Sequence, residues 1–143
     1  MALVSLIGIS LMAAPGAAPL PPQVQQEIDF LLEYIGTSGC EFYRNGSWHD
    51  AKAAQAHVRS KYSFLLRRDL IATTEDFIER AATRSSLSGE PYRIRCAGSE
   101  EIAADRWLRD ELARFRSLNP PPGANPPGPQ GAPRQEQRSA GHS

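Results

Sequence analysis

The sequence lacks several of the patterns that identify a class of function directly. Its 143 residues include two cysteines, and these do not form the Cys-x-x-Cys motif of thiol redox enzymes. There is no Gly-x-Ser-x-Gly motif, the elbow that carries the nucleophile in many serine hydrolases. The 16 basic and 16 acidic side chains balance, so the net charge does not indicate nucleic acid as a partner. The sequence alone therefore assigns no reaction to the protein.

Proline is nearly absent from the middle of the chain. Of the 12 prolines, only Pro91 lies between residues 23 and 118. We therefore expect a single domain over residues 23–118, long enough for one small core. Residues 119–143 are rich in Pro and Gly and have no aliphatic side chain larger than alanine. We expect this segment to be a disordered tail.

The N-terminus carries an apolar run without charge, residues 2–14. The run is shorter than the ~20 residues that a bilayer span requires, and small residues and prolines follow it. No lysine or arginine precedes it. The pattern predicts a signal peptide over residues 1–18, hence a periplasmic or secreted protein with no stable membrane insertion after signal removal. An uncleaved membrane anchor is the alternative.

The domain alternates helical patterns with two short strands. Apolar residues at helical spacing predict helices over four segments, which are 23–35, Ser47 to about Arg67, Thr73 to about Arg84, and 99–118. Ser47 is the expected N-cap of the second helix, with Asp50 completing a weak capping box. Strands are expected over 40–44 and 91–96. The expected fold class is α+β, mainly helical, with about four helices packed on a two-stranded antiparallel ribbon.

One register of the two strands satisfies several constraints together. If Cys40 lies opposite Cys96, Phe42 lies opposite Ile94 and Arg44 opposite Tyr92 on one face. On the other face Glu41 then lies opposite Arg95, and Tyr43 opposite Arg93. A slip of one residue would turn the charged side chains inward. We therefore predict a disulfide between the two cysteines, as is common in small exported proteins.

Four segments of the sequence resemble the YfeK-like family of small secreted bacterial proteins. They are Phe-Tyr-Arg-Asn-Gly-Ser-Trp-His at 42–49, Ala54 with His57, Val58 and Lys61, Thr-Glu-Asp-Phe-Ile at 74–78, and Ser-Ser-Leu-Ser-Gly-Glu-Pro-Tyr at 85–92. The resemblance covers about residues 24–115. It implies export to the periplasm of a Gram-negative bacterium. It implies no activity, because the family is a domain of unknown function.

Two histidines on the second predicted helix are candidates for chemistry. His49 and His57 are eight residues apart, which places them ~12 Å apart along a helix. That spacing is too long for a shared metal, and we predict neither a metal site nor a cofactor. Ser86 or Ser88 with His49 or His57 as base would make a serine-dependent hydrolase. Since Ser/Gly-rich turns commonly satisfy backbone groups only, this is the alternative hypothesis, and we expect no catalytic residues.

A binding site is the preferred hypothesis. The predicted register brings the turn after the first strand toward the serine-rich turn, and their polar side chains would suit a small anionic or sugar-like ligand, with stacking on Tyr92. The protein is then a non-catalytic binding or accessory module of the cell envelope, whose partner is such a ligand or an unknown envelope protein. The rival reading is structural, with Arg44 and Asn45 fastening the serine turn. The candidate ligand-binding residues are Arg44, Asn45, His49, His57, Ser86, Ser88 and Tyr92.

Overall fold

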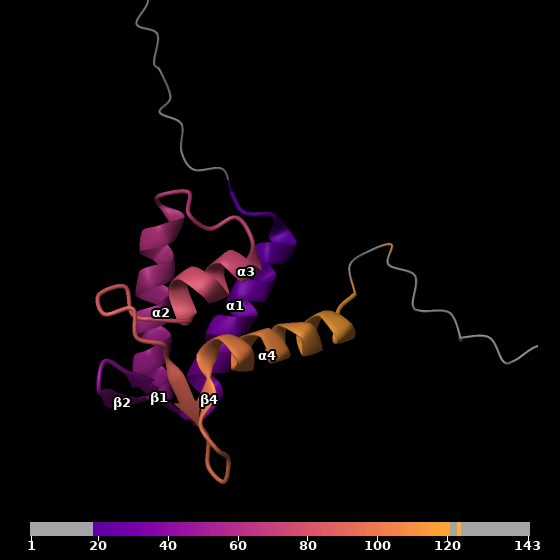
Figure 1. Cartoon of the computed structure of the whole chain (residues 1–143). Helices are drawn as coiled ribbons and strands as arrows, with labels where there is room; N and C mark the ends of the chain where they lie inside the picture. The colour runs from indigo at the N-terminus through magenta and orange to yellow at the C-terminus, as the bar shows by residue number, and fades with distance from the viewer. Residues whose placement is uncertain (1–18, 121–122, 124–143) are drawn as a thin grey trace, which may run out of the picture.

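The computed structural model of the protein describes residues 19–120 and residue 123 (Figure 1). The expected signal peptide over 1–18 lies outside the described residues, as does nearly all of the expected disordered tail. Among the described residues, none of the helices has the length and apolar character that a bilayer span requires.

The described part of the chain contains four α-helices and four strands, so the α+β class and the four helices are confirmed. A π-helical turn, η1, continues α3. The elements in chain order are α1 (Pro22–Thr37), β1 (Glu41–Arg44), β2 (Ser47–Asp50), α2 (Ala51–Leu66), α3 (Thr74–Phe77), η1 (Ile78–Ala82), β3 (Arg93–Arg95), β4 (Ile102–Ala103) and α4 (Ala104–Leu118).

The sheet has the antiparallel order β2-β1-β3-β4, so the expectation of a two-stranded ribbon is wrong. The helix start at Ser47 is also wrong, because Asn45 and Gly46 both have positive φ, 47° and 85°. Two such residues form the tight turn of a β-hairpin, so the chain reverses and β2 pairs with β1. The N-cap of α2 is Asp50, whose carboxylate accepts a hydrogen bond of 2.7 Å from the Ala53 N–H.

The predicted register between β1 and β3 is confirmed. Glu41 pairs with Arg95, Phe42 with Ile94, and Tyr43 with Arg93. The disulfide lies immediately beyond this ladder and joins Cys40 to Cys96. The expected pair of Arg44 with Tyr92 lies outside the ladder, because β3 begins at Arg93, one residue after Tyr92.

The last helix begins later than the sequence pattern predicts. Residues 99–101 belong to neither helix nor strand, and Ile102 pairs with Ile94 as part of β4 before α4 starts at Ala104. Ile102 therefore belongs to the sheet and not to a first helical turn.

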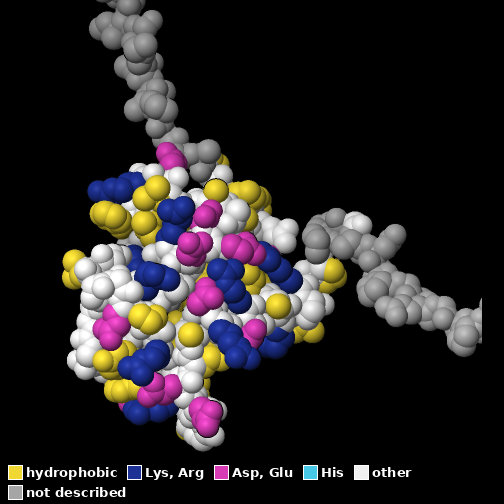
Figure 2. Space-filling model, in the orientation of Figure 1, with side chains coloured by type: hydrophobic (Ala, Val, Ile, Leu, Met, Phe, Trp, Pro, Cys, Tyr) yellow, Lys and Arg dark blue, Asp and Glu magenta, His cyan; other side chains and the backbone are white. Residues whose placement is uncertain are grey.

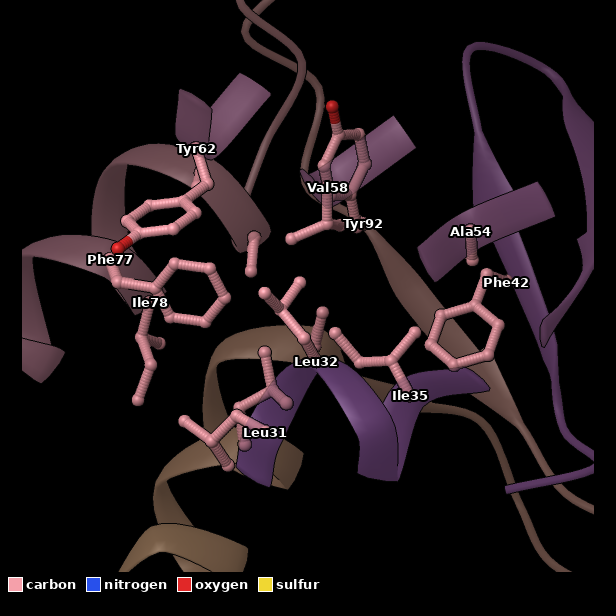
Figure 3. Packing of buried hydrophobic residues seen from close by; sticks show 14 of the residues in the cluster. Leu31, Leu32, Ile35, Phe42, Ala54, Val58, Tyr62, Phe77, Ile78 and Tyr92 are labelled. Atoms are coloured by element: carbon pink, nitrogen blue, oxygen red, sulfur yellow. The ribbon is translucent and has the colours of Figure 1, made fainter. Parts of the chain in front are cut away.

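The core lies between the helices and the inner face of the sheet (Figure 3). Helix α1 packs against α2, α3 and α4, while α2 and α4 also contact the sheet. From the sheet, Phe42 and Ile94 point into this core. The side chains with no exposed surface include Ile28, Leu31, Leu32, Phe77, Ile78 and Ile94.

A charged network ties α1 to α3 and α4. Glu27 is 1% exposed, and Arg116 donates to its two carboxylate oxygens at 2.8 and 2.7 Å. The same guanidinium donates to Glu75 at 2.7 Å, and the Thr74 hydroxyl also donates to Glu27. The hydrogen bonds from Arg116 hold the pKa of Glu27 below its ordinary value, although burial opposes this.

Candidate functional site

Two turns that are distant in sequence meet beside α2. One is the hairpin turn between β1 and β2, and the other is the serine turn, defined here as Ser85–Gly89. The segment between η1 and β3, which contains the serine turn, lies alongside α2 (Figure 1). Lys61 of α2 donates a hydrogen bond of 2.6 Å to the carbonyl of Arg84, immediately before the serine turn. The Ser88 hydroxyl donates to Oδ1 of Asn45 at 2.9 Å.

The serine turn is held by its own hydrogen bonds. Ser85 is buried, and its hydroxyl oxygen accepts from the N–H groups of Leu87 and Ser88. Its backbone N–H donates to the Glu90 carbonyl, and its carbonyl accepts from the Gly89 N–H. Gly89 has a φ of 73°, which favours glycine at this position. The turn therefore presents its remaining side chains from a fixed backbone.

A groove of about 680 Å³ lies between these two turns and α2. Six of the seven candidate ligand-binding residues line it, and the seventh, Ser88, contacts Asn45 without lining the groove. The geometric convergence expected from the strand register is therefore present. The residues that line the groove are Arg44, Asn45, Ser47, His49, His57, Ser60, Lys61, Phe64, Ser85, Ser86, Leu87 and Tyr92.

The charge of the groove is of one sign. Among the described residues that line it, the charged side chains are Arg44 and Lys61, and none is an aspartate or glutamate. On the face of the molecule shown in Figure 2, by contrast, basic and acidic side chains are interspersed. A local excess of positive charge in a neutral protein favours an anion in the groove.

Arg44 differs from the other arginines that the structure describes. Within the described part of the chain, Arg44 makes no ion pair or side-chain hydrogen bond, yet it is only partly exposed. The neighbouring strand arginines are paired, Arg93 with Glu101 at 2.7 Å and Arg95 with Glu41 at 2.8 Å. The remaining described arginines without a carboxylate partner are all solvent-exposed; they are Arg59, Arg67, Arg68 and Arg84. Arg44 is thus a half-buried cation that faces a groove without a counter-ion among the described residues.

Two rings that line the groove, those of His57 and Tyr92, contact each other. Nε2 of His57 lies 3.2 Å from the Tyr92 hydroxyl, within hydrogen-bond distance. Burial lowers the pKa of His57, and the positive charges of Arg44, Lys61 and His49 lower it further. Burial also lowers the pKa of Lys61 and raises the pKa of Tyr92. His57 is therefore a neutral hydrogen-bonding group at pH 7.

The expected stacking of a ligand on Tyr92 is wrong. Tyr92 is 7% exposed, because its ring packs in the core beside Val58 (Figure 3). The ammonium of Lys61 lies 5.5 Å from the ring centroid, and the ring of His57 meets it edge-on. The hydroxyl points away from Leu31 and Leu32, so it is the part of Tyr92 that faces the groove (Figure 3).

The hydrolase alternative has no supporting contact among the described residues. Neither His49 nor His57 makes a hydrogen bond to a serine side chain there, and Nε2 of His57 is occupied by Tyr92. Ser88 donates to Asn45 instead of a histidine. Within residues 19–120 and 123, no group of three or more His, Cys, Asp or Glu side chains is placed to hold a metal ion.

One wall of the groove was not predicted from the sequence. Ser60, Lys61 and Phe64 line it together with His57, and the four positions follow the i, i+3, i+4, i+7 spacing of one helix face. This spacing, counted from His57, is the sequence signal that could have identified these lining residues. The other lining residues that were not predicted are Ser47 and, from the serine turn, Ser85 and Leu87.

Comparison with known proteins places this fold in a family. A family model described as a family of unknown function, DUF5329, matches residues 22–116, which include every element that lines the groove. The chain belongs to the DUF5329 family. The uncharacterized protein YfeK of Salmonella typhimurium is 31% identical to it over 83 residues, which are 57% of this chain and 68% of YfeK. The resemblance to the YfeK-like family is thereby confirmed. No solved structure matches the chain.

Proposed function

We propose that this DUF5329 protein is a non-catalytic binding module of the cell envelope that holds a small anionic ligand in the groove. The observation that carries the proposal is Arg44, a half-buried guanidinium with no carboxylate partner among the described residues. Desolvating a cation is unfavourable unless an anion or hydrogen-bond acceptor compensates it. A ligand carboxylate, phosphate or sulfate would supply that partner with charge-assisted hydrogen bonds.

The other groove residues suit the same ligand. Lys61 adds a second positive charge, while the exposed Ser86 hydroxyl and Asn45 side chain offer neutral hydrogen bonds to an anion or to sugar hydroxyls. Phe64 and Leu87, 47% and 95% exposed, provide an apolar rim. A sugar that carries an acidic group therefore fits the lining better than a neutral sugar does.

The envelope assignment rests on the disulfide and on the sequence pattern. Cys40 and Cys96 are joined, and disulfides persist in the periplasm and outside the cell but are rare in the cytosol. The apolar run over residues 2–14 has the pattern of a signal peptide and therefore also supports export. An accessory role beside another envelope protein is compatible with the groove, whose ligand would then be an acidic group of that partner.

The absence of catalysis is part of the proposal. A fluorophosphonate probe reacts with activated serine nucleophiles and is expected to leave this protein unlabelled. Labelling that disappears in Ser86→Ala or Ser88→Ala would contradict the proposal and favour the hydrolase. Ser63→Ala on α2 is the matched control, because its hydroxyl donates to the Arg59 carbonyl and does not line the groove.

Calorimetric titration at low ionic strength tests the binding itself. The probes are sulfate, glucose 6-phosphate and glucose, applied to the wild type, Arg44→Ala and Arg59→Ala. Arg59 is the matched control, since it is exposed on α2 and does not line the groove. We expect Arg44→Ala to weaken binding of both anions about 10- to 100-fold, as for the loss of a hydrogen bond to a charged group. Equal affinities in the two variants would contradict the proposal.

A further inference from the structure

A small cavity lies beneath the groove. Its volume is about 30 Å³, and it shares Arg44, His49, His57 and Tyr92 with the groove above. The groove and the cavity are therefore adjacent spaces that share these four side chains as a wall. Below them the walls are apolar core residues from the helices and the sheet, including Ile35, Phe42, Val58, Ile94 and Leu108.

The cavity exists because small side chains stand where larger ones would fill it. Four alanines line it, Ala53 and Ala54 from α2, Ala82 from η1 and Ala104 from α4. Ala54, Ile35 and Phe42 lie around one space at the end of the cluster nearest the sheet (Figure 3). A cavity of this volume holds about two groups of the size of a water molecule. Apolar cavities of proteins stay dry and accept apolar ligands.

We infer that the groove and the cavity form one site with two compartments, and that its ligand is an anion with a short alkyl or acyl branch. The inference rests on the proposed function, because the anion is held by Arg44 in the groove. The branch, about two or three carbon atoms long, enters the cavity between His57 and the β1 side chains.

This arrangement divides the ligand by polarity. The anionic group stays in the solvated groove, where Arg44 and Lys61 neutralise it, while the branch is removed from water by the alanines below. Hydrophobic transfer favours each buried carbon by a factor of about four in affinity. An anion that lacks the branch leaves the cavity empty and gains nothing from it.

The test compares methyl phosphate with propyl phosphate, which carry the same charge and differ by two carbons. On the wild-type protein we expect propyl phosphate to bind about 15-fold more tightly, which is fourfold for each extra carbon. Ala54→Val narrows the cavity without touching the groove lining and should remove this preference while methyl phosphate binding persists. Ala56→Val is the matched control, because Ala56 is exposed on the same helix and lines neither space.

The outcomes separate this inference from the proposed function. If methyl phosphate binds the wild type but not Arg44→Ala, and propyl phosphate binds no more tightly, the inference is overturned and the proposed function stands. If neither alkyl phosphate binds the wild type, both are overturned. The two alkyl phosphates on the wild type decide the question even if Ala54→Val fails to fold.

Discussion

The Ser88 hydroxyl donates a hydrogen bond of 2.9 Å to Oδ1 of Asn45, across 43 positions of sequence. This contact joins the tip of the serine turn to the tip of the β1–β2 hairpin. Both turns contribute residues to the groove lining, so this contact fixes the position of one part of the lining relative to the other. The bond is exposed to solvent, and its role is to position the turns more than to stabilise the fold.

Ser88→Ala removes this bond and also the one that the Ser88 hydroxyl oxygen accepts from the Glu90 N–H at 3.3 Å. Because both bonds are exposed, we expect the free energy of unfolding to fall by only about 1 kcal/mol, the low end for two hydrogen bonds. The expected consequence is faster amide hydrogen exchange in the serine turn. Ser86→Ala is the control, because the Ser86 side chain is exposed and makes no hydrogen bond within the described residues. Equal exchange in the two variants would show that the contact does not hold the turns together.

The Arg116 network predicts a much larger effect on stability. Arg116→Ala leaves the carboxylate of Glu27, 1% exposed, without its cation. We expect a loss of about 3 kcal/mol, the lower part of the range for breaking a buried pair, because the Arg116 side chain is 40% exposed. Arg106→Ala removes an exposed i,i+4 pair of α4 and should change stability by less than about 0.5 kcal/mol. Urea unfolding of both variants checks the difference, and similar losses would contradict the account.

The same network gives a pH dependence. The folded pKa of Glu27 is lowered, so the stabilisation it provides is present above the ordinary carboxyl pKa of about 4.3 and is lost as pH falls through the folded value. Acid unfolding should therefore begin below about pH 4 in the wild type. In Arg116→Ala the pKa of Glu27 rises, and unfolding should begin at higher pH. An unchanged acid transition would contradict this.

The disulfide is expected to contribute substantially to stability. It closes a loop with a sequence separation of 56 residues, for which chain entropy predicts about 4 kcal/mol. Removing both thiols, by Cys40→Ala with Cys96→Ala, should lower the free energy of unfolding by that amount. Reductant should destabilise the wild type and leave the double variant unchanged. A double variant as stable as the oxidised wild type would show that the loop is restrained by packing alone.

His57 provides a pH-dependent signal of an occupied groove. Burial and nearby positive charge hold its pKa below the ordinary value of about 6.5. Neutral His57 therefore stabilises the fold above about pH 6.5, and this contribution is lost as pH falls through the folded pKa. A bound anion offsets the charge of Arg44 and should raise the pKa of His57. Titration of the imidazole by NMR with and without sulfate, whose charge is constant here, measures the shift. No shift with sulfate would contradict an anion beside His57.

The strand register was predictable because several constraints agreed. The two cysteines, the pair Phe42 and Ile94, and the pair Glu41 and Arg95 satisfy one alignment, and a slip would bury charge. The hairpin was missed because Ser47 and Asp50 also fit a helix start. In the structure the positive φ of Asn45 and Gly46 decides between these patterns, and four polar or aromatic residues then form β2. The two-residue strand β4 is too short to leave a period-2 pattern.

The site was predictable where it depends on the strands and not where it depends on helix packing. The register brings Arg44 and Tyr92 together, and both line the groove. Helical spacing places Lys61 and Phe64 on the same face of α2 as His57, but the serine turn that packs beside this face is placed by the tertiary fold, so both residues were missed. The burial of Tyr92 is likewise a property of the packed core, which is why ligand stacking on its ring was expected wrongly.

An anion held by Arg44 contacts its guanidinium, so the Nε–H group of Arg44 reports on binding directly. Arginine-detected NMR of the wild type during a sulfate titration follows the Nε–H resonances of Arg44 and Arg59. We expect a saturable shift of the Arg44 resonance, while the Arg59 resonance does not move. A shift of Arg44 that is absent, or that matches Arg59 and rises linearly with sulfate, would contradict anion binding by Arg44.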